Sequence, residues 1–323
     1  MKKELSVDER FELITRNSAE IVGLDELKRI LGKKDKPVAY CGYEPNGPMH
    51  LGHFVTILKL MDLQKAGFSV RILLADVHAM LNRKGSEKEI KEEVVAWKKT
   101  IKAIGIKAEI VLGSDFQFRK EYQLDVMRLA QHSTINRGLR SMQEIARDVE
   151  NATISQLWYP LMQVVDIKFL GVDVALGGLE QRKVHMIGKD MENVLAHKFI
   201  AFHMPLITSL KGPGQKMSKS VEGSWISVVD SQDQIEKVIK GAYCPEKETE
   251  ENPILQICQF VIFPLLEKLK IERPVKFGGN LEIKSYGELE DVYSKGKLHP
   301  LDLKNSVANN LEKIIAPIRK NFK

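Results

Sequence analysis

The first two thirds of the chain alternate between two hydrophobic patterns. Short, almost continuous apolar runs are typical of strands buried in a parallel sheet, and the longer segments between them carry apolar residues at helical spacing. The predicted strands are 38–43, 69–76, 107–113, 171–178 and 197–207. The predicted helices are 8–31, 51–66, 86–104 and 121–150, with another that opens at "LEQRKVHM". Because strands and helices alternate, we expect an α/β fold with a Rossmann-like, doubly wound parallel sheet.

After about residue 229 helical periodicity dominates, and prolines mark the breaks between helices. The helices predicted there are 231–242, 252–269, 286–296 and 302–321. We therefore predict a first domain at 1–228 and a smaller, mostly helical C-terminal domain at 229–323. The first domain would contain a helical insertion at about 115–160 and a loop rich in glycine and lysine at 210–223.

The composition is that of an ordinary globular protein, with 43% hydrophobic and 28% charged residues. The longest apolar runs fall short of the roughly 20 residues that cross a membrane. The N-terminus has no apolar core, so we expect no signal peptide. Three cysteines without a CxxC pair argue against a disulfide framework and favour the cytoplasm. The net charge of +6 permits a nucleic-acid partner without establishing one.

Two histidines, His50 and His53, stand three residues apart in "HLGH", directly after the first predicted strand. They could begin a metal site, but Asp76, His78 and His185 are not at metal-ligand spacing from them, so we expect no metal held by the protein. Packing of two ordinary histidines is a second interpretation. The third is anion binding, because a helix that follows a parallel strand directs free N–H groups toward the ligand-binding edge of the sheet.

A second stretch favours the anion interpretation. "KMSKS" carries Lys216, Ser218 and Lys219 in a loop flanked by glycines. Such a loop is most often solvated surface. Its lysines nevertheless provide mobile point charges for a polyphosphate, and its glycines permit closure over a bound nucleotide.

The two motifs, in this order and in this fold, resemble the signatures of class I aminoacyl-tRNA synthetases. "AYCGYEPNGPMHLGH", "ILLADVHAMLN", "YPLMQVVDIKFLGVDVALGGLEQRKVHM" and "HPLDLKNSVA" are similar to tyrosyl-tRNA synthetases of the archaeal/eukaryotic type, from about Phe11 to the C-terminus. The resemblance implies a tyrosine–tRNA ligase that forms tyrosyl-adenylate from ATP and then charges tRNA(Tyr). It also implies a homodimer and Mg²⁺ bound through the ATP phosphates, without a membrane or DNA partner.

A tyrosine pocket must pair one phenol hydroxyl inside an apolar cavity, and Asp166 suits that task because it lies in a largely apolar stretch. Tyr159, Gln163 and Asp166 have the spacing of one helical face. The resemblance implies that Tyr40 and Asp166 contact the phenol, and that Tyr159, Gln163 and Gln181 hold the ammonium and carboxylate end. A site built around a hydroxyl rejects phenylalanine by roughly 10⁴–10⁵, a range that comes from tyrosyl enzymes themselves.

The resemblance assigns the ATP site to both motifs and to the end of the fourth predicted strand. His50, His53, Lys216 and Lys219 would act on the phosphates as catalytic residues. The residues implied to bind other parts of ATP, or to let it approach, are Gly42, Gly52, Gly178, Glu180 and Ser218. Glu180 stands where many relatives carry aspartate, which puts its contact with the ribose in question.

The resemblance also implies tRNA contacts in both domains. Those expected at the acceptor end are Arg140, Arg182 and Lys183. Those expected at the anticodon are Phe277, His299 and Asp302. As ordinary features these would be solvated charges and a packing aromatic, so each assignment depends on the resemblance.

Three alternatives remain open from the sequence. A tryptophanyl-tRNA synthetase shares both motifs, and an indole N–H would also suit Asp166. An adenylyltransferase of small molecules would lack an RNA partner, which the basic charge and helical C-terminal domain disfavour. A non-catalytic RNA-binding relative is disfavoured because His50, His53, Lys216 and Lys219 are all present.

Overall fold

The computed structural model describes residues 5–33, 35–145, 151 and 153–322. The chain forms two compact units. Unit 1 consists of Met1–Asn46, Lys59–Lys98 and Ile106–Pro205, and unit 2 consists of Gly47–Leu58, Lys99–Gly105 and Leu206–Lys323. The division passes through two helices, α3 (Leu51–Lys65) and α5 (Glu87–Ile104). The functional domains expected at 1–228 and 229–323 stay predictions.

Unit 1 contains a six-stranded sheet in the order β1-β6-β5-β2-β3-β4. Its strands are β1 (Glu20–Val22), β2 (Val38–Tyr43), β3 (Ser69–Leu74), β4 (Glu109–Leu112), β5 (Val174–Gly178) and β6 (Ile200–Met204). Strands β2 to β6 pair in parallel, which confirms the predicted α/β sheet. The strand order reverses beside β2, so the carboxyl ends of β2 and β5 form the edge where such sheets bind ligands.

The segment 8–31, predicted as one helix, is divided in the structure. It forms α1 (Val7–Thr15), strand β1 and α2 (Leu24–Lys33). Asn17 and Gly23 adopt left-handed backbone conformations, with φ of 56° and 105°, and these interrupt the helical path. The residues between them pair antiparallel with β6 and extend the sheet by a strand that periodicity did not indicate.

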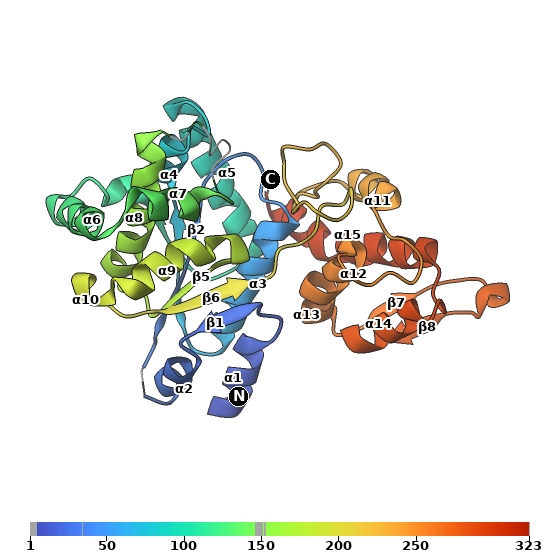
Figure 1. Ribbon diagram of the computed structural model, residues 1–323. Coiled ribbons are helices and arrows are strands. Elements are labelled where there is room, and N and C mark those ends of the chain that lie inside the picture. The colour runs from blue at the N-terminus through green and yellow to red at the C-terminus, as the bar shows by residue number, and fades with distance from the viewer. Residues whose placement is uncertain (1–4, 34, 146–150, 152, 323) are drawn as a thin grey trace. The chain divides into compact units, whose positions relative to one another are not determined.

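Helices cover this sheet and shape the pocket. Figure 1 shows α8 and α9, which pack against each other, with α9 on β5 and β6. The remaining elements of the unit are α4 (Asp76–Leu81), η1 (Gly113–Asp115), α6 (Lys120–His132), α7 (Ile135–Met142), α8 (Ile154–Phe169), η2 (Leu179–Gln181), α9 (Arg182–Asp190) and α10 (Glu192–Leu195). The helix predicted at 121–150 breaks before α7, where Thr134 accepts a hydrogen bond from the Arg137 N–H as a helix cap. Residues 146–150 of that prediction lie outside the described residues.

Unit 2 is mostly helical, as the periodicity predicts. Its elements after the 210–223 loop are α11 (Gln232–Gly241), α12 (Pro253–Ile257), the π-helix η3 (Cys258–Ile262), α13 (Phe263–Leu266), β7 (Leu269–Ile271), η4 (Val275–Phe277), β8 (Leu281–Ile283), α14 (Tyr286–Ser294) and α15 (Pro300–Phe322). The predicted helix 252–269 ends early because Glu267 takes a left-handed conformation, with φ of 60°. The small antiparallel pair of β7 and β8 was not predicted.

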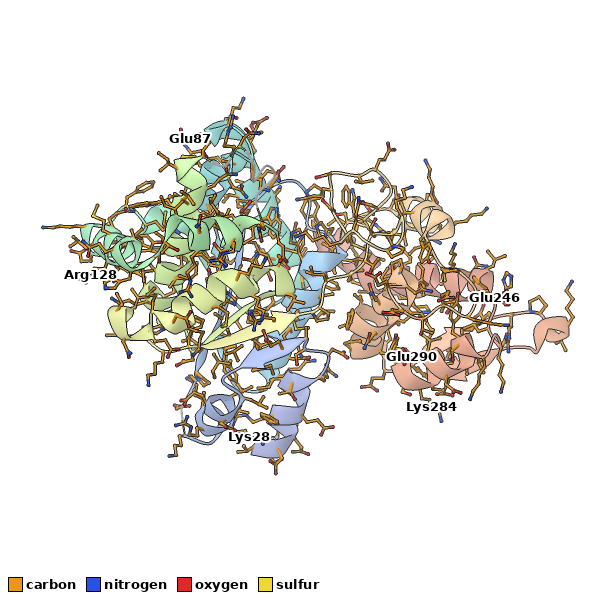
Figure 2. The ribbon with its side chains drawn as sticks, in the orientation of Figure 1. Lys28, Glu87, Arg128, Glu246, Lys284 and Glu290 are labelled. Carbon is orange, nitrogen blue, oxygen red and sulfur yellow. The ribbon has the colours of Figure 1, made fainter. Side chains whose placement is uncertain are left out.

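Charged side chains project from the outside of each unit. Figure 2 labels Lys28 and Arg128 in unit 1 and Lys284 in unit 2, and all three are exposed. None of the described helices combines the length and the apolarity that crossing a membrane requires.

Candidate active site

A buried carboxylate organises a pocket in unit 1. Asp166, on α8, is 0% exposed. Its Oδ1 accepts hydrogen bonds from the Tyr122 hydroxyl at 2.7 Å and from Gln117 Nε2 at 2.8 Å. Its Oδ2 has no hydrogen-bond partner. Burial raises the pKa of Asp166 to about 7, although the two hydrogen bonds favour the charged form.

A hydrogen-bond donor faces the free carboxylate oxygen. His78 Nε2 lies 3.6 Å from Asp166 Oδ2 and also has no hydrogen-bond partner. The other ring nitrogen, Nδ1, lies 3.3 Å from Gln117 Nε2, which is a donor. Nδ1 is therefore the acceptor, and Nε2 carries the hydrogen. Because burial lowers the pKa of His78 to about 4, the ring is neutral at pH 7. A hydroxyl both donates and accepts, so it complements this pair of atoms.

Tyr40, on strand β2, is 2% exposed and lies close enough to Asp166 to respond to its charge. Burial and the neighbouring charge of Asp166 hold the pKa of Tyr40 well above its usual value, so its hydroxyl stays a donor. A Cβ on Gly42 would stand 2.6 Å from this hydroxyl oxygen, which explains the glycine two residues along the strand.

Polar atoms continue along α8 away from the carboxylate. Gln163 Nε2 donates to Gln181 Oε1 at 3.1 Å, while Gln163 Oε1 is buried without a partner. Glu180 Oε2 is likewise buried and unpartnered. Tyr159 adds a neutral hydroxyl, because burial and the Glu44 carboxylate hold its pKa well above the usual value. The free oxygens are acceptors, which suits a ligand that presents an ammonium and hydroxyl groups.

The distribution of unpartnered atoms marks this pocket as a binding site. Among the described residues, six buried side-chain atoms lack a hydrogen-bond partner, and five belong to the group just described. They belong to His78, Gln117, Gln163, Asp166 and Glu180, and the sixth to Ser133. Buried polar atoms are ordinarily paired, so five of them on α8 and the segments that contact it mark this region as the candidate binding site for a polar ligand.

The "HLGH" motif lies at the start of α3, in unit 2. His50 Nδ1 accepts a hydrogen bond from the Gly52 N–H at 3.1 Å, and His53 Nδ1 accepts from the His50 N–H at 3.3 Å. Both rings therefore carry their hydrogen on Nε2 and present it as a donor. Burial, together with the charges of Lys219 and Lys216, lowers the pKa of His50 to about 3. Burial and the His50 ring likewise lower the pKa of His53.

The segment after the "KMSKS" motif pairs with the histidine segment. The Leu51 N–H donates to the Ile226 carbonyl at 3.0 Å, and the Val228 N–H donates to the Met49 carbonyl at 3.0 Å. Met217 anchors the loop, since it is 4% exposed. The histidine segment is thus hydrogen-bonded through its backbone to the residues that follow the "KMSKS" loop.

Lys219 lies across the turn that precedes the histidines. A Cβ on Gly47 would stand 3.4 Å from Lys219 Nζ, and Gly47 itself has a φ of 63° that favours glycine. The structure therefore brings Lys219 close to the histidine motif, and its charge contributes to the lowered pKa of both histidines. Neutral donors, lysine charges and a helix N-terminus together suit a polyphosphate.

The metal interpretation of the histidines finds no support in the described part of the chain. No group of three His, Cys, Asp or Glu side chains is placed there to hold a metal ion.

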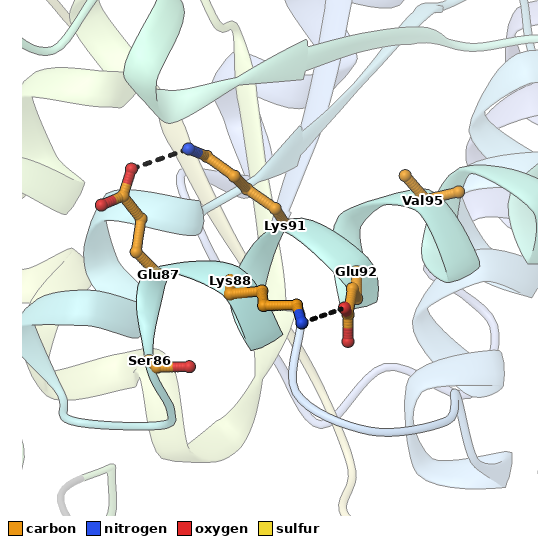
Figure 3. Close-up of a pocket in the computed structure, with 6 residues that line it drawn as sticks. All are labelled: Ser86, Glu87, Lys88, Lys91, Glu92 and Val95. Carbon is orange, nitrogen blue, oxygen red and sulfur yellow. Dashed lines mark hydrogen bonds and ion pairs between the residues drawn. The ribbon is translucent and has the colours of Figure 1, made fainter.

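A surface hollow of about 640 Å³ on α5 does not have the features of a ligand-binding site. Figure 3 shows that it is lined by charged side chains, in which Glu87 pairs with Lys91 and Glu92 with Lys88. Exposed pairs one helical turn apart are ordinary solvated surface.

The residues expected to contact tRNA occupy varied surroundings. Arg140 is exposed on α7, and Lys183 pairs with Glu144 at 3.1 Å. Arg182 Nε donates to Glu20 at 2.8 Å. In unit 2, His299 Nδ1 accepts from the Leu301 N–H at 3.2 Å, and Asp302 lies in the first turn of α15. Phe277 ends η4, and its side chain lies outside the described part of the chain.

Sequence reasoning missed three polar residues of the pocket. Gln117 and Tyr122 follow strand β4 and hold Asp166 Oδ1, and His78 was considered only as a metal ligand. The available signal was the position of His78 and Gln117, just after the carboxyl ends of two adjacent parallel strands.

The raised pKa of Asp166 makes a prediction about stability. An acid with a higher pKa in the folded than in the unfolded state stabilises the fold below the unfolded pKa, and this contribution is lost as pH rises through the folded pKa. Asp166→Asn should remove this dependence of the free energy of unfolding on pH. Its free energy of unfolding relative to the parent should rise between pH 4 and 7, by up to about 1.4 kcal/mol per pH unit. Urea unfolding across this range measures it, and a difference that stays constant would contradict the raised pKa.

Comparisons with known proteins agree with this geometry. The family model described as "tRNA synthetases class I (W and Y)" matches residues 33–316. A tyrosine–tRNA ligase of Methanocaldococcus jannaschii is 49% identical, over 97% of this chain and 100% of the relative. The crystal structure of the tyrosyl-tRNA synthetase of Archaeoglobus fulgidus complexed with L-tyrosine superposes with a TM-score of 0.95 at 45% identity. The superposition covers 98% of this chain and 100% of the Archaeoglobus fulgidus chain.

The tryptophan alternative has weaker support. The tryptophanyl-tRNA synthetase of Giardia lamblia has a TM-score of 0.75 at 19% identity, covering 97% of this chain and 88% of its own, which shows a shared fold alone. The tyrosine enzymes of Methanocaldococcus jannaschii and Archaeoglobus fulgidus match at 45% identity and above over nearly the full length. The chain belongs to the class I aminoacyl-tRNA synthetases and, within them, to the tyrosine–tRNA ligases of the archaeal type.

Proposed function

We propose that the two units divide the tyrosine–tRNA ligase reaction between them. The pocket of unit 1 selects tyrosine, and the paired motifs of unit 2 act on the phosphates of ATP. The observation that carries this proposal is the pair of buried, unpartnered atoms at the end of the pocket, Asp166 Oδ2 and His78 Nε2. A phenol hydroxyl satisfies both, whereas the ring of phenylalanine would leave both unpaired.

The substrate tyrosine lies along α8 in this proposal. Its phenol donates to Asp166 and contacts the hydroxyl of Tyr40. Its ammonium donates to the free Oε1 of Gln163 and is held further by Tyr159 and Gln181. The support is the helical spacing of Tyr159, Gln163 and Asp166 on one element, together with the hydrogen bond between Gln163 and Gln181.

In the first step a carboxylate oxygen of tyrosine attacks the α-phosphorus of ATP. The new P–O bond forms as the bond to pyrophosphate breaks, so no side-chain nucleophile is required. His50 and His53 donate Nε2–H groups to phosphate oxygens, and Lys216 and Lys219 neutralise the leaving pyrophosphate, with Ser218 as a further donor. Being neutral, the histidines act through hydrogen bonds, which complement the lysine charges.

The adenosine part of ATP meets glycines and one acid. Glu180, beside Gly178, offers its unpartnered Oε2 to the ribose hydroxyls. A Cβ on Gly178 would lie 2.2 Å from that oxygen. The family resemblance places Gly42 and Gly52 near the adenosine, although the space beside their Cα atoms holds the Tyr40 hydroxyl and the His50 ring. Mg²⁺ that accompanies ATP would be held through the phosphate oxygens, as the family resemblance implies, and would neutralise part of their charge.

In the second step a hydroxyl of the 3′-terminal adenosine of tRNA(Tyr) attacks the tyrosyl carbonyl, and AMP leaves. Arg140 and Lys183 are proposed to contact the acceptor end, since both are exposed near the helical insertion at about 115–160. Phe277, His299 and Asp302 are proposed to contact the anticodon, where an aromatic ring stacks on a base and a carboxylate accepts its hydrogen bonds.

The chain is proposed to act as a homodimer in the cytoplasm. Apolar side chains are exposed on the helical insertion of unit 1, and they are Phe118, Leu124, Met127, Ile135 and Ile154. Exposed apolar side chains gathered on one part of a protein are typical of an association surface. The cytoplasmic setting is supported by the three cysteines, none of which forms a disulfide.

Pyrophosphate exchange into ATP tests the tyrosine proposal without tRNA. Among the twenty amino acids, tyrosine should drive exchange most strongly, because it alone places a phenol between Asp166 and His78. Phenylalanine should be slower by at least about a hundredfold, since it leaves two buried groups unpaired. Exchange driven best by tryptophan, or by no amino acid, would contradict the proposal.

The role of Lys219 has its own prediction. Lys219→Ala should slow adenylate formation by about a hundredfold, because a charge that stabilises the leaving phosphates is lost. Tyrosine affinity should change less than twofold. Single-turnover adenylate formation and tyrosine titration separate the two effects. Lys211→Ala is the matched control, as an exposed lysine of the same loop. Lost tyrosine affinity with normal adenylate formation would refute the role.

The anticodon contacts are tested by comparing two reactions of one variant. Asp302→Ala should reduce tRNA charging by about tenfold, the cost of one base contact, and should leave pyrophosphate exchange unchanged. Phe277→Ala should likewise reduce tRNA charging and leave pyrophosphate exchange unchanged. Asp291→Ala, an exposed acid on α14 that pairs with Lys295, serves as the control. Equal losses in both reactions would indicate damaged folding rather than lost recognition.

A further inference from the structure

A chain of four polar side chains connects the surface of unit 1 to its buried interior. Arg182 Nε donates to Glu20 Oε2 at 2.8 Å, and the same oxygen lies 3.0 Å from His203 Nδ1. His203 Nε2 in turn lies 3.0 Å from His185 Nδ1. The two imidazole rings stack, with centroids 5.1 Å apart, and both are at most 1% exposed. None of these contacts belongs to the tyrosine pocket or to the phosphate motifs.

The direction of each hydrogen bond in this chain is determined. A carboxylate only accepts, so His203 Nδ1 carries a hydrogen and His203 Nε2 is the acceptor. His185 must then donate from Nδ1. Burial lowers the pKa of His185 to about 3, so the pair has no spare proton that would reverse this order. The chain therefore holds one arrangement of α9 relative to strands β6 and β1.

The chain ends beside the residues proposed to bind substrate. In the sheet register, Glu20 is opposite His203, and His203 is opposite Gly177. A Cβ on Gly177 would stand 2.9 Å from Gln181 and 3.4 Å from His185, so both side chains pack on its bare backbone. Arg182, the first residue of α9, directly follows Gln181. Both ends of the chain thus hold the turn η2, which carries Glu180 and Gln181.

We propose that Glu20, His203, His185 and Arg182 are positioning residues, which fix η2 so that Gln181 meets the ammonium of tyrosine and Glu180 meets ATP. The inference depends on the roles proposed for Gln181 and Glu180. It gives Arg182 a part in amino-acid activation, in place of the tRNA contact that the family resemblance implies. The two roles differ in their consequences, because pyrophosphate exchange contains no tRNA.

The test measures pyrophosphate exchange for Glu20→Ala, Arg182→Ala and the double variant. Each single change should raise the apparent KM for tyrosine about tenfold, the scale of a small misplacement of a binding group, and should change kcat less than threefold. The double variant should be no more than about twofold worse than the worse single variant, since both break one chain. The ratio of tyrosine to phenylalanine activity should stay unchanged, because the Asp166 pocket is untouched.

Two further variants make the result decisive. Glu109→Ala removes a comparable cross-strand pair, Arg71 Nε to Glu109 Oε2 at 2.7 Å, far from η2 in the sheet order, and should leave the KM within twofold of the parent. Gln181→Ala should raise the KM at least as much as Glu20→Ala. If Gln181→Ala has no effect, the proposed role of Gln181 fails, and the positioning role fails with it.

The positioning role alone fails if Gln181→Ala raises the KM and Glu20→Ala does not. It also fails if Arg182→Ala leaves exchange unchanged and lowers only tRNA charging. Urea midpoints within error of the parent show that lost stability does not cause the kinetic change. A large fall in the midpoint that tracks the KM in every variant would replace positioning by a general structural role.

Discussion

The buried carboxylate of Asp166 is the constraint on which the tyrosine pocket depends. A carboxylate without solvent is costly, and only one of its oxygens is paired within the protein. Tyr122 and Gln117, which follow β4 in the chain, donate hydrogen bonds to that oxygen. The other oxygen is left for the substrate. The protein thus keeps an unfavourable group in its core, and we propose that the phenol of tyrosine pairs with it.

The two proposed substrate sites differ in which of their side chains carry a charge. Around Asp166, the side chains of His78 and Tyr40 are neutral, and the Tyr122 hydroxyl donates a hydrogen bond to the acid. At the phosphate motifs, two neutral histidines lie with lysines, whose charges lower the pKa of both rings. In the proposed function, selection of the amino acid depends on pairing buried polar atoms, and binding of the ATP phosphates depends on charge and the N-terminus of α3. Gln163 Oε1 and Glu180 Oε2 are further buried acceptors that lack a hydrogen-bond donor.

Hydrophobic periodicity predicted the strands β2 to β6 and the helical C-terminal region, because long buried elements leave clear patterns. It did not find β1, a short edge strand between two left-handed residues, or the β7–β8 pair. The family resemblance implied Tyr40 and Asp166, which the structure brings close together. Tyr122 and the His185–His203 pair could not be found from the sequence, because their roles depend on contacts between elements distant in the chain.

The central claim is that the free oxygen of Asp166 receives the phenol hydroxyl. Calorimetric binding of tyrosine and of phenylalanine to the parent and to Asp166→Asn forms a double cycle that isolates this contact. The account predicts a coupling free energy of about 1.5–3 kcal/mol between the hydroxyl and the carboxylate, as for a hydrogen bond to a charged group. A coupling near zero, with tyrosine still preferred over phenylalanine by the variant, would contradict it.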